Sequence, residues 1–152
     1  MERLSHKMIG RIIEALDPVM VEGIINEYSP LSENIQIVPK IHERVISLFP
    51  DLEEYDRVIL FVALVYRIYI PASFLSKSTH STRAHSRQKL PAGIRDLAAS
   101  CIGYRNSEMV NYFKDHADPF VKNPRFRAKM RIVTDALGLT APSLTYNYVT
   151  EE

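Results

Sequence analysis

The most constraining feature of this 152-residue chain is its most apolar run, Val58–Ile70 (VILFVALVYRIYI). A membrane-spanning helix needs about 20 apolar residues, and Arg67 interrupts this run, so it is too short and too polar to cross a bilayer. We therefore expect it to be the buried central helix of a core. A buried strand is the alternative, because Val, Ile and Tyr favour strands. The segment from Asp51 to Ile70, which includes this run, is longer than a typical strand, and its length favours the helix.

Apolar residues at helical spacing and well-placed prolines mark the other elements. In residues 4–16 the apolar side chains recur every three or four positions, which predicts one amphipathic helix. Asp17 and Pro18 follow as N-cap and first residue of a second helix, which ends near Pro30. Residues 31–38 alternate only weakly and fit a loop or a short extended piece.

The remaining helices are expected on both sides of a polar segment. Pro39 is the expected first residue of a third helix, and Asp51 with Glu54 resembles a capping box for the helix that holds the apolar run. Three more helices are expected at about 92–102, 107–115 and 124–137. The last is the best marked, with Asn123 as N-cap, Pro124 at its first position and Gly138 at its end.

Residues 76–90 (SKSTHSTRAHSRQKL) are Ser, Thr, His and basic residues with almost nothing apolar. Such a segment is typical of a linker or long exposed loop. We expect an all-α protein with four parts: an acidic helical half at 1–75, this basic linker at 76–90, a basic helical half at 91–138 and a polar-aromatic tail at 139–152.

The net charge of +1 conceals a strong asymmetry between the two halves. Residues 1–76 hold 7 Lys and Arg against 11 Asp and Glu, whereas residues 77–131 hold 12 against four. A stretch of net charge +8 favours a polyanionic partner. The alternative is a basic solvated surface that the acidic half balances within one fold.

Residues 95–114 (RDLAASCIGYRNSEMVNYFK) resemble the helix-turn-helix motif of bacterial and phage DNA-binding proteins. Ala99 occupies the small position of the first helix, and Gly103 occupies the turn, where a positive φ is needed. The resemblance implies that five further apolar residues are buried: Ala98, Ile102, Tyr104, Met109 and Tyr112. An ordinary helical hairpin with Gly in its turn is the alternative.

In a helix-turn-helix the second helix enters the major groove of DNA. The resemblance implies that Val110 and five polar or cationic residues project outward toward the bases and phosphates: Arg105, Asn106, Ser107, Asn111 and Lys114. Arg pairs well with guanine and Asn with adenine. Glu108 would repel phosphate if it faced DNA.

Two flanking basic segments are expected to contact phosphates. The linker contributes Arg83, Arg87 and Lys89, which precede the motif as a flexible arm. The outer side of the last helix contributes Arg125, Arg127, Lys129 and Arg131, in like-charge pairs at i,i+4. A solvated helix surface explains these pairs equally well.

Catalytic and metal-binding patterns are not found in the sequence. It has no phosphate-binding glycine loop, dinucleotide fingerprint or nucleophile elbow. Cys101 is the only cysteine, and His80 and His85 have no ligand partners at suitable spacing. We therefore expect no enzyme activity, cofactor or metal. Polar and charged residues recur throughout the first 18 residues and leave no uninterrupted apolar core of a signal peptide, from which we expect a cytoplasmic protein without a membrane partner.

The function expected from the sequence is sequence-specific binding of double-stranded DNA, as a small transcriptional regulator or accessory DNA-binding protein. The N-terminal half is the expected surface of a homodimer. The main alternative is a non-catalytic helical interaction or assembly subunit of a larger complex. A third hypothesis is an RNA or single-strand binder that stacks bases on Tyr104, Phe113 and Phe120.

Overall fold

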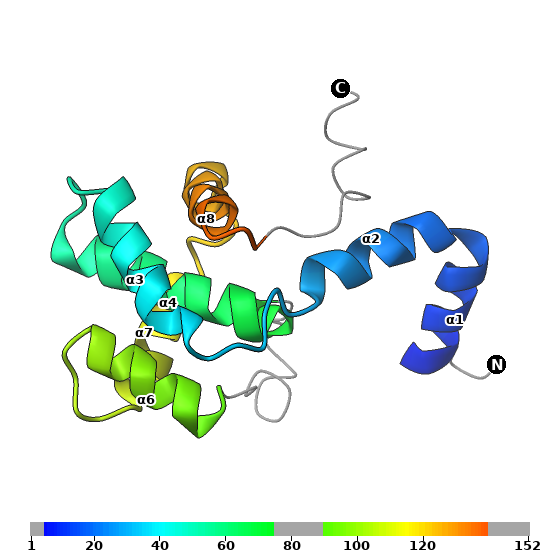
Figure 1. Cartoon of the computed structure of the whole chain (residues 1–152). Coiled ribbons are helices and arrows are strands. Elements are labelled where there is room, and N and C mark those ends of the chain that lie inside the picture. Colours follow the sequence, from blue (N-terminus) through cyan, green and yellow to red (C-terminus); the bar gives the residue numbers. More distant parts are fainter. Residues whose placement is uncertain (1–4, 75–89, 140–152) are drawn as a thin grey trace. The chain divides into compact units, whose positions relative to one another are not determined.

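The computed structural model describes residues 5–74 and 90–139, and these residues form helices joined by short turns (Figure 1). The all-α class is therefore confirmed. The described residues contain no strand, so the strand alternative for Val58–Ile70 is excluded. The elements are α1 (His6–Leu16), α2 (Pro18–Tyr28), α3 (Ile37–Leu48), α4 (Glu54–Tyr69), the 3-10 turn η1 (Pro71–Phe74), α6 (Ala92–Cys101), α7 (Met109–Ala117) and α8 (Pro124–Ala136).

Two predicted caps are confirmed. Asp17 Oδ1 accepts a hydrogen bond from the Met20 amide at 3.0 Å. Asn123 Oδ1 accepts one from the Arg125 amide at 2.8 Å. After α8, Gly138 has a φ of +71°, the left-handed conformation that glycine adopts without a Cβ clash.

The predicted starts of α3 and α4 are each wrong by two residues. α3 begins at Ile37, so Pro39 lies inside its first turn, where the missing amide proton breaks no helical hydrogen bond. The capping box is absent, because the N-cap of α4 is Glu53 and it makes no side-chain cap bond. Asp51 belongs instead to the preceding turn, in which the Leu52 amide donates to the Phe49 carbonyl at 3.2 Å.

The described residues divide into two compact units. α1 and α2 make up the first, and the second begins at Pro30. Within the second unit α4 packs against α3, α7 and α8, and α3 also packs against α6 and α8. The division thus falls between Ser29 and Pro30 rather than in residues 76–90, and the second unit combines helices from both sides of that segment.

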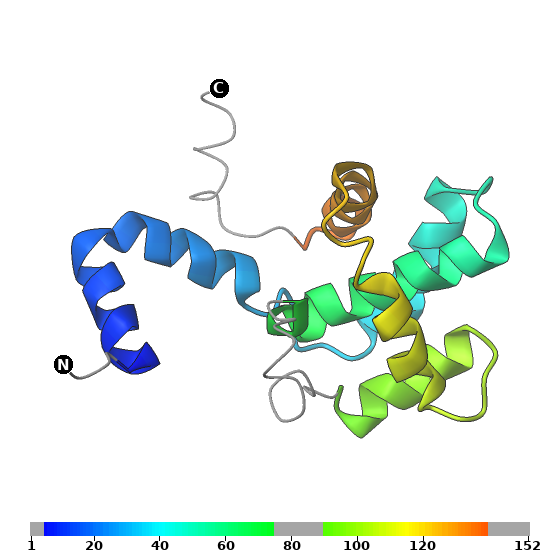
Figure 2. The same cartoon turned by 180° about the vertical axis from the view of Figure 1, so that it is seen from behind.

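α4 is the centre of the second unit. Figures 1 and 2 show it running between α8 on one side and α6 on the other. A helix that is apolar on all sides must be covered on all sides, and every residue from Ile59 to Tyr66 is buried. At its end the Tyr69 hydroxyl donates to the Asn34 carbonyl at 2.6 Å, and burial raises the pKa of Tyr69 to about 12. No helix within residues 5–74 and 90–139 has the length and apolarity of a membrane span.

His42 on α3 should make the stability of this unit depend on pH. Its ring lies edge-on to the ring of Phe61, with centroids 5.1 Å apart. Burial, and then the positive charge of Arg57, lower the pKa of His42 below its ordinary 6.5, while Glu43 acts in the opposite direction. Below about pH 6.5 the unfolded chain therefore binds a proton that the folded chain resists. We expect the free energy of unfolding to fall as the pH falls from that value through the folded pKa.

Urea denaturation at about pH 7.5 and about pH 5.5 tests this expectation, with His42→Gln as the non-titrating variant. The variant should lose less stability between the two pH values than the wild type. Equal losses in both proteins would show that His42 titrates alike in the folded and unfolded chains.

Candidate nucleic-acid interface

The hairpin of α6 and α7 has the expected turn. Gly103 has a φ of +84°, and the Tyr104 amide donates to the Ala99 carbonyl at 2.9 Å. Ala98 and Ala99 are buried, as predicted. A small residue before a glycine turn therefore lets the chain reverse closely between these helices.

The side of α7 that is buried differs from the prediction. Val110 was expected to face outward but is fully buried, together with Phe113 and Ala117 one and two turns later. Tyr112 and Tyr104 were expected inside but are 49% and 39% exposed.

The physical reason lies in the turn before α7. Residues 104–108 stay outside the helix, and the Asn106 side chain accepts a hydrogen bond from the Glu108 amide at 2.9 Å. α7 therefore begins at Met109 rather than near residue 107. The apolar set that then packs against α4 is Val110, Phe113 and Ala117, at helical spacing.

Lys114 was predicted to contact DNA but is buried, with 7% of its surface exposed. Its Nζ lies 2.6 Å from Asp118 Oδ1 and 4.7 Å from the centroid of the Phe74 ring. It also lies 5.3 Å from the centroid of the Tyr66 ring. A carboxylate and two aromatic faces thus surround the ammonium group, so it is not available to phosphate. The i,i+4 spacing of Lys114 and Asp118 is the sequence feature from which this ion pair could have been predicted.

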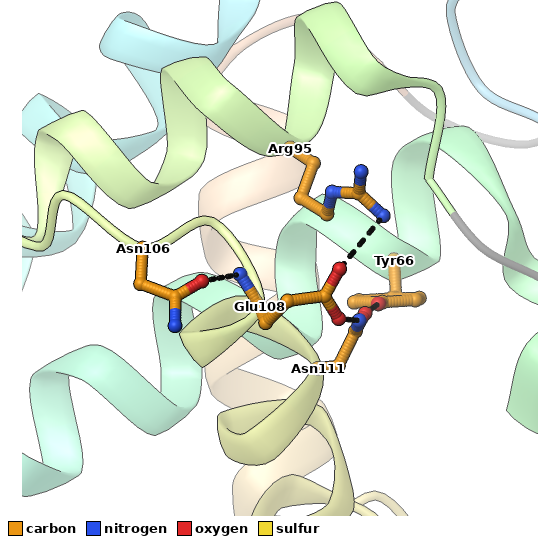
Figure 3. A network of polar contacts seen from close by, with 5 residues as sticks. All are labelled: Tyr66, Arg95, Asn106, Glu108 and Asn111. Carbon is orange, nitrogen blue, oxygen red and sulfur yellow. Dashed lines mark hydrogen bonds and ion pairs between the residues drawn. The ribbon is translucent and has the colours of Figure 1, made fainter.

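Asn111, the second predicted base-reading residue on α7, holds the hairpin to the core. Figure 3 shows its amide between Tyr66 on α4 and Glu108. The Tyr66 hydroxyl donates to Asn111 Oδ1 at 2.9 Å, and Asn111 Nδ2 donates to Glu108 Oε2 at 2.7 Å. Arg95 on α6 lies 3.7 Å from the other Glu108 oxygen. Burial raises the pKa of Tyr66, so its hydroxyl remains a donor across the physiological range.

The surface that the hairpin presents to solvent is therefore partly acidic. Tyr112 and Asp115 are exposed on α7, Glu108 is exposed at its N-cap, and Ser107 is half-buried. Two carboxylates in that position oppose the approach of phosphate. Arg105 and Asn106 are exposed in the turn, as expected.

α8 carries the predicted cations in an exposed arrangement. Arg125, Arg127 and Arg131 are exposed and Lys129 is half-buried, while Met130, Val133 and Thr134 face the core. At about 100° per residue, the cations form two rows on opposite flanks of the helix. We name them the Arg125 row (Arg125 and Lys129) and the Arg127 row (Arg127 and Arg131). Between the rows lie Ala128, Asp135 and Ile132, the last 47% exposed.

Other predicted residues are placed as follows. Arg83, Arg87 and Lys89 lie outside the described residues. Of the three aromatic residues in the single-strand hypothesis, Tyr104 and Phe120 are exposed but Phe113 is buried, because it faces α4. Across residues 5–74 and 90–139, no three His, Cys, Asp or Glu side chains come together as a metal site.

Comparison of the chain with protein-family models, curated proteins and solved structures gave no match.

Proposed function

We propose that the protein binds double-stranded DNA through α8, as a small transcriptional regulator or accessory DNA-binding protein. The observation that carries the proposal is the pair of cationic rows on opposite flanks of one exposed helix. A helix about 10–12 Å across fits a major groove about 12 Å wide, whose two edges are lined by phosphates. With α8 in the groove, the cations of each row would lie beside the phosphates of one strand, so that both strands are contacted together.

Phosphate contacts supply affinity and register, whereas base contacts supply specificity. Between the rows, Ala128 and Ile132 offer apolar contact, for which the thymine methyl group is the natural partner, and the exposed carboxylate of Asp135 can accept a hydrogen bond from the amino group of cytosine. The exposed Arg105 is the remaining candidate for a guanine contact, because Asn111 and Lys114 are engaged inside the protein. We therefore expect binding with a large phosphate component and modest sequence discrimination.

Fluorescence anisotropy with a labelled mixed-sequence duplex tests the proposal. Binding should weaken steeply as salt rises from about 50 to about 200 mM, because each phosphate contact releases counterions. An unlabelled duplex should compete better than the matching single strand. Absence of binding at low salt would contradict the proposal, and preferential displacement by the single strand would favour the single-strand hypothesis.

α1 supports a second proposal, a homodimer. Met8, Ile9, Ile12, Ile13 and Leu16 are between 37% and 79% exposed on this short helix, and we name them the α1 stripe. Two helices of 11 residues each are marginal alone in water and too small to bury such a stripe. An apolar stripe can cover itself in a two-fold pair, since the same surface then serves both copies.

Sedimentation equilibrium tests the homodimer. Ile9→Glu with Ile12→Glu should convert a wild-type dimer to a monomer, because two charges would enter the paired stripe. Ile132→Glu on α8 is the matched control, since its side chain is 47% exposed and lies outside the stripe. A monomeric wild type, or a variant that remains dimeric, would contradict the pairing.

A further inference from the structure

A cavity of about 230 Å³ lies in the second unit, where the beginning of α8 packs over the beginning of α4. Its floor is apolar and includes Ile59 and Leu60, which are 2% and 1% exposed. Its volume is below the roughly 300–1,000 Å³ typical of drug-sized ligands. It therefore suits an occupant of one or two rings.

Two phenylalanines form one wall of the cavity. The rings of Phe120 and Phe126 are stacked, with centroids 5.7 Å apart and planes 30° apart. Phe120 is 42% exposed, so part of its ring has no protein cover. A flat apolar group beside these rings would remove aromatic surface from water and gain stacking. This wall favours an aromatic occupant.

The rim of the cavity carries charge of both signs with an excess of cations. Arg125 and Lys129 lie one helical turn apart on α8, and Asp56 of α4 also lines the cavity. No ion pair between described residues engages Arg125, Lys129 or Asp56. The first amides of α8 are already occupied, because Asn123 Oδ1 accepts from Arg125 and Phe126. Anion binding here therefore depends on the two side chains and not on the end of the helix.

We propose that this cavity binds a small aromatic anion. The ring lies against Phe120 and Phe126, and its carboxylate or phosphate group pairs with Arg125 and Lys129. Asp56 accepts a hydrogen bond from a hydroxyl or amino substituent on the ring. The proposal of a ligand site does not rest on the proposed DNA binding, but the ligand and DNA should compete, because both use the Arg125 row.

Amide-resolved NMR titration of the full chain, without DNA, tests the site. Phenyl phosphate and benzoate are the complete probes, because each carries both an aromatic ring and an anionic group. Phenol carries the ring without the anion, and inorganic phosphate is the anion without the ring. Either complete probe should shift amides around Phe120–Lys129 and bind about tenfold more tightly than either half. Phenyl phosphate and benzoate together show which anion is preferred.

Lys129→Met is the deciding variant, because it keeps the apolar stem and removes the charge. It should weaken the binding of the complete probe about tenfold and leave the binding of phenol unchanged. Arg131→Met, on the opposite flank of α8, is the matched control and should bind the probe as the wild type does. The spectra themselves report that each variant is folded. Equal binding by the two variants, or shifts confined to other residues, would overturn the proposal.

Discussion

Replacement of Lys114 by methionine is expected to lower the free energy of unfolding by about 2–4 kcal/mol. The ammonium group lies 2.6 Å from Asp118, whose side chain is 13% exposed. It also faces two aromatic rings. Methionine fills similar space but removes the positive charge that faces the largely buried Asp118 carboxylate. Removal of one partner from a buried pair costs more than removal of both.

Chemical denaturation of five proteins measures this effect: the wild type, Lys114→Met, Asp118→Leu, the double variant and a control, Lys122→Met. The double variant Lys114→Met with Asp118→Leu should recover part of the loss, and the coupling energy isolates the pair. Lys122→Met, at an exposed position, should change stability by less than about 0.5 kcal/mol. If Lys114→Met were as stable as the wild type, the ammonium group would lie in water, on the outward side of α7 where the sequence alone predicts it.

Removal of the Arg127 row should weaken duplex DNA binding on the order of 50-fold at about 0.1 M salt. Arg127 and Arg131 follow one flank of an exposed helix and, in the proposed complex, face the phosphates of one strand. Two lost phosphate contacts give this factor, because each contact releases nearly one counterion. Arg127→Ala with Arg131→Ala, measured by anisotropy with one duplex, gives the ratio of dissociation constants.

The matched control for this pair is Lys40→Ala with Arg44→Ala. These residues are also exposed, also at i,i+4 spacing and also on a helix of the second unit, α3. The control removes the same net charge but leaves α8 intact, so its affinity should fall by only a few-fold at most. Equal losses in the two variants would mean that net charge, and not α8, determines binding.

Local features made much of the fold predictable. Asp17 with Pro18 and Asn123 with Pro124 define helix starts by hydrogen bonds to residues two or three positions away, and the structure has both. Residues 59–66 are all apolar, and burial of this stretch on all sides is the arrangement that removes it from water. The turn at Gly103 required a positive φ that glycine adopts readily.

The parts that the sequence did not predict depend on distant contacts. The orientation of α7 is determined by its packing on α4 and by the Tyr66–Asn111 hydrogen bond, between residues 45 positions apart. The burial of Lys114 likewise depends on Phe74 and Tyr66, which belong to other elements. The helix-turn-helix template assigned inward and outward positions by spacing alone, and a slightly longer turn changed them. Composition also suggested a boundary at 76–90, whereas tertiary packing places the division before Pro30.

The central proposal is that α8 contacts DNA. Its most direct test is the slope of the logarithm of the association constant for duplex DNA against the logarithm of the salt concentration. The measurement compares the wild type with the variant that lacks Arg127 and Arg131, over about 50–200 mM salt. If the Arg127 row contacts phosphates, the slope of the variant should be smaller in magnitude by about two. Parallel lines for the two proteins would show that these arginines make no phosphate contact, and would contradict the proposed role of α8.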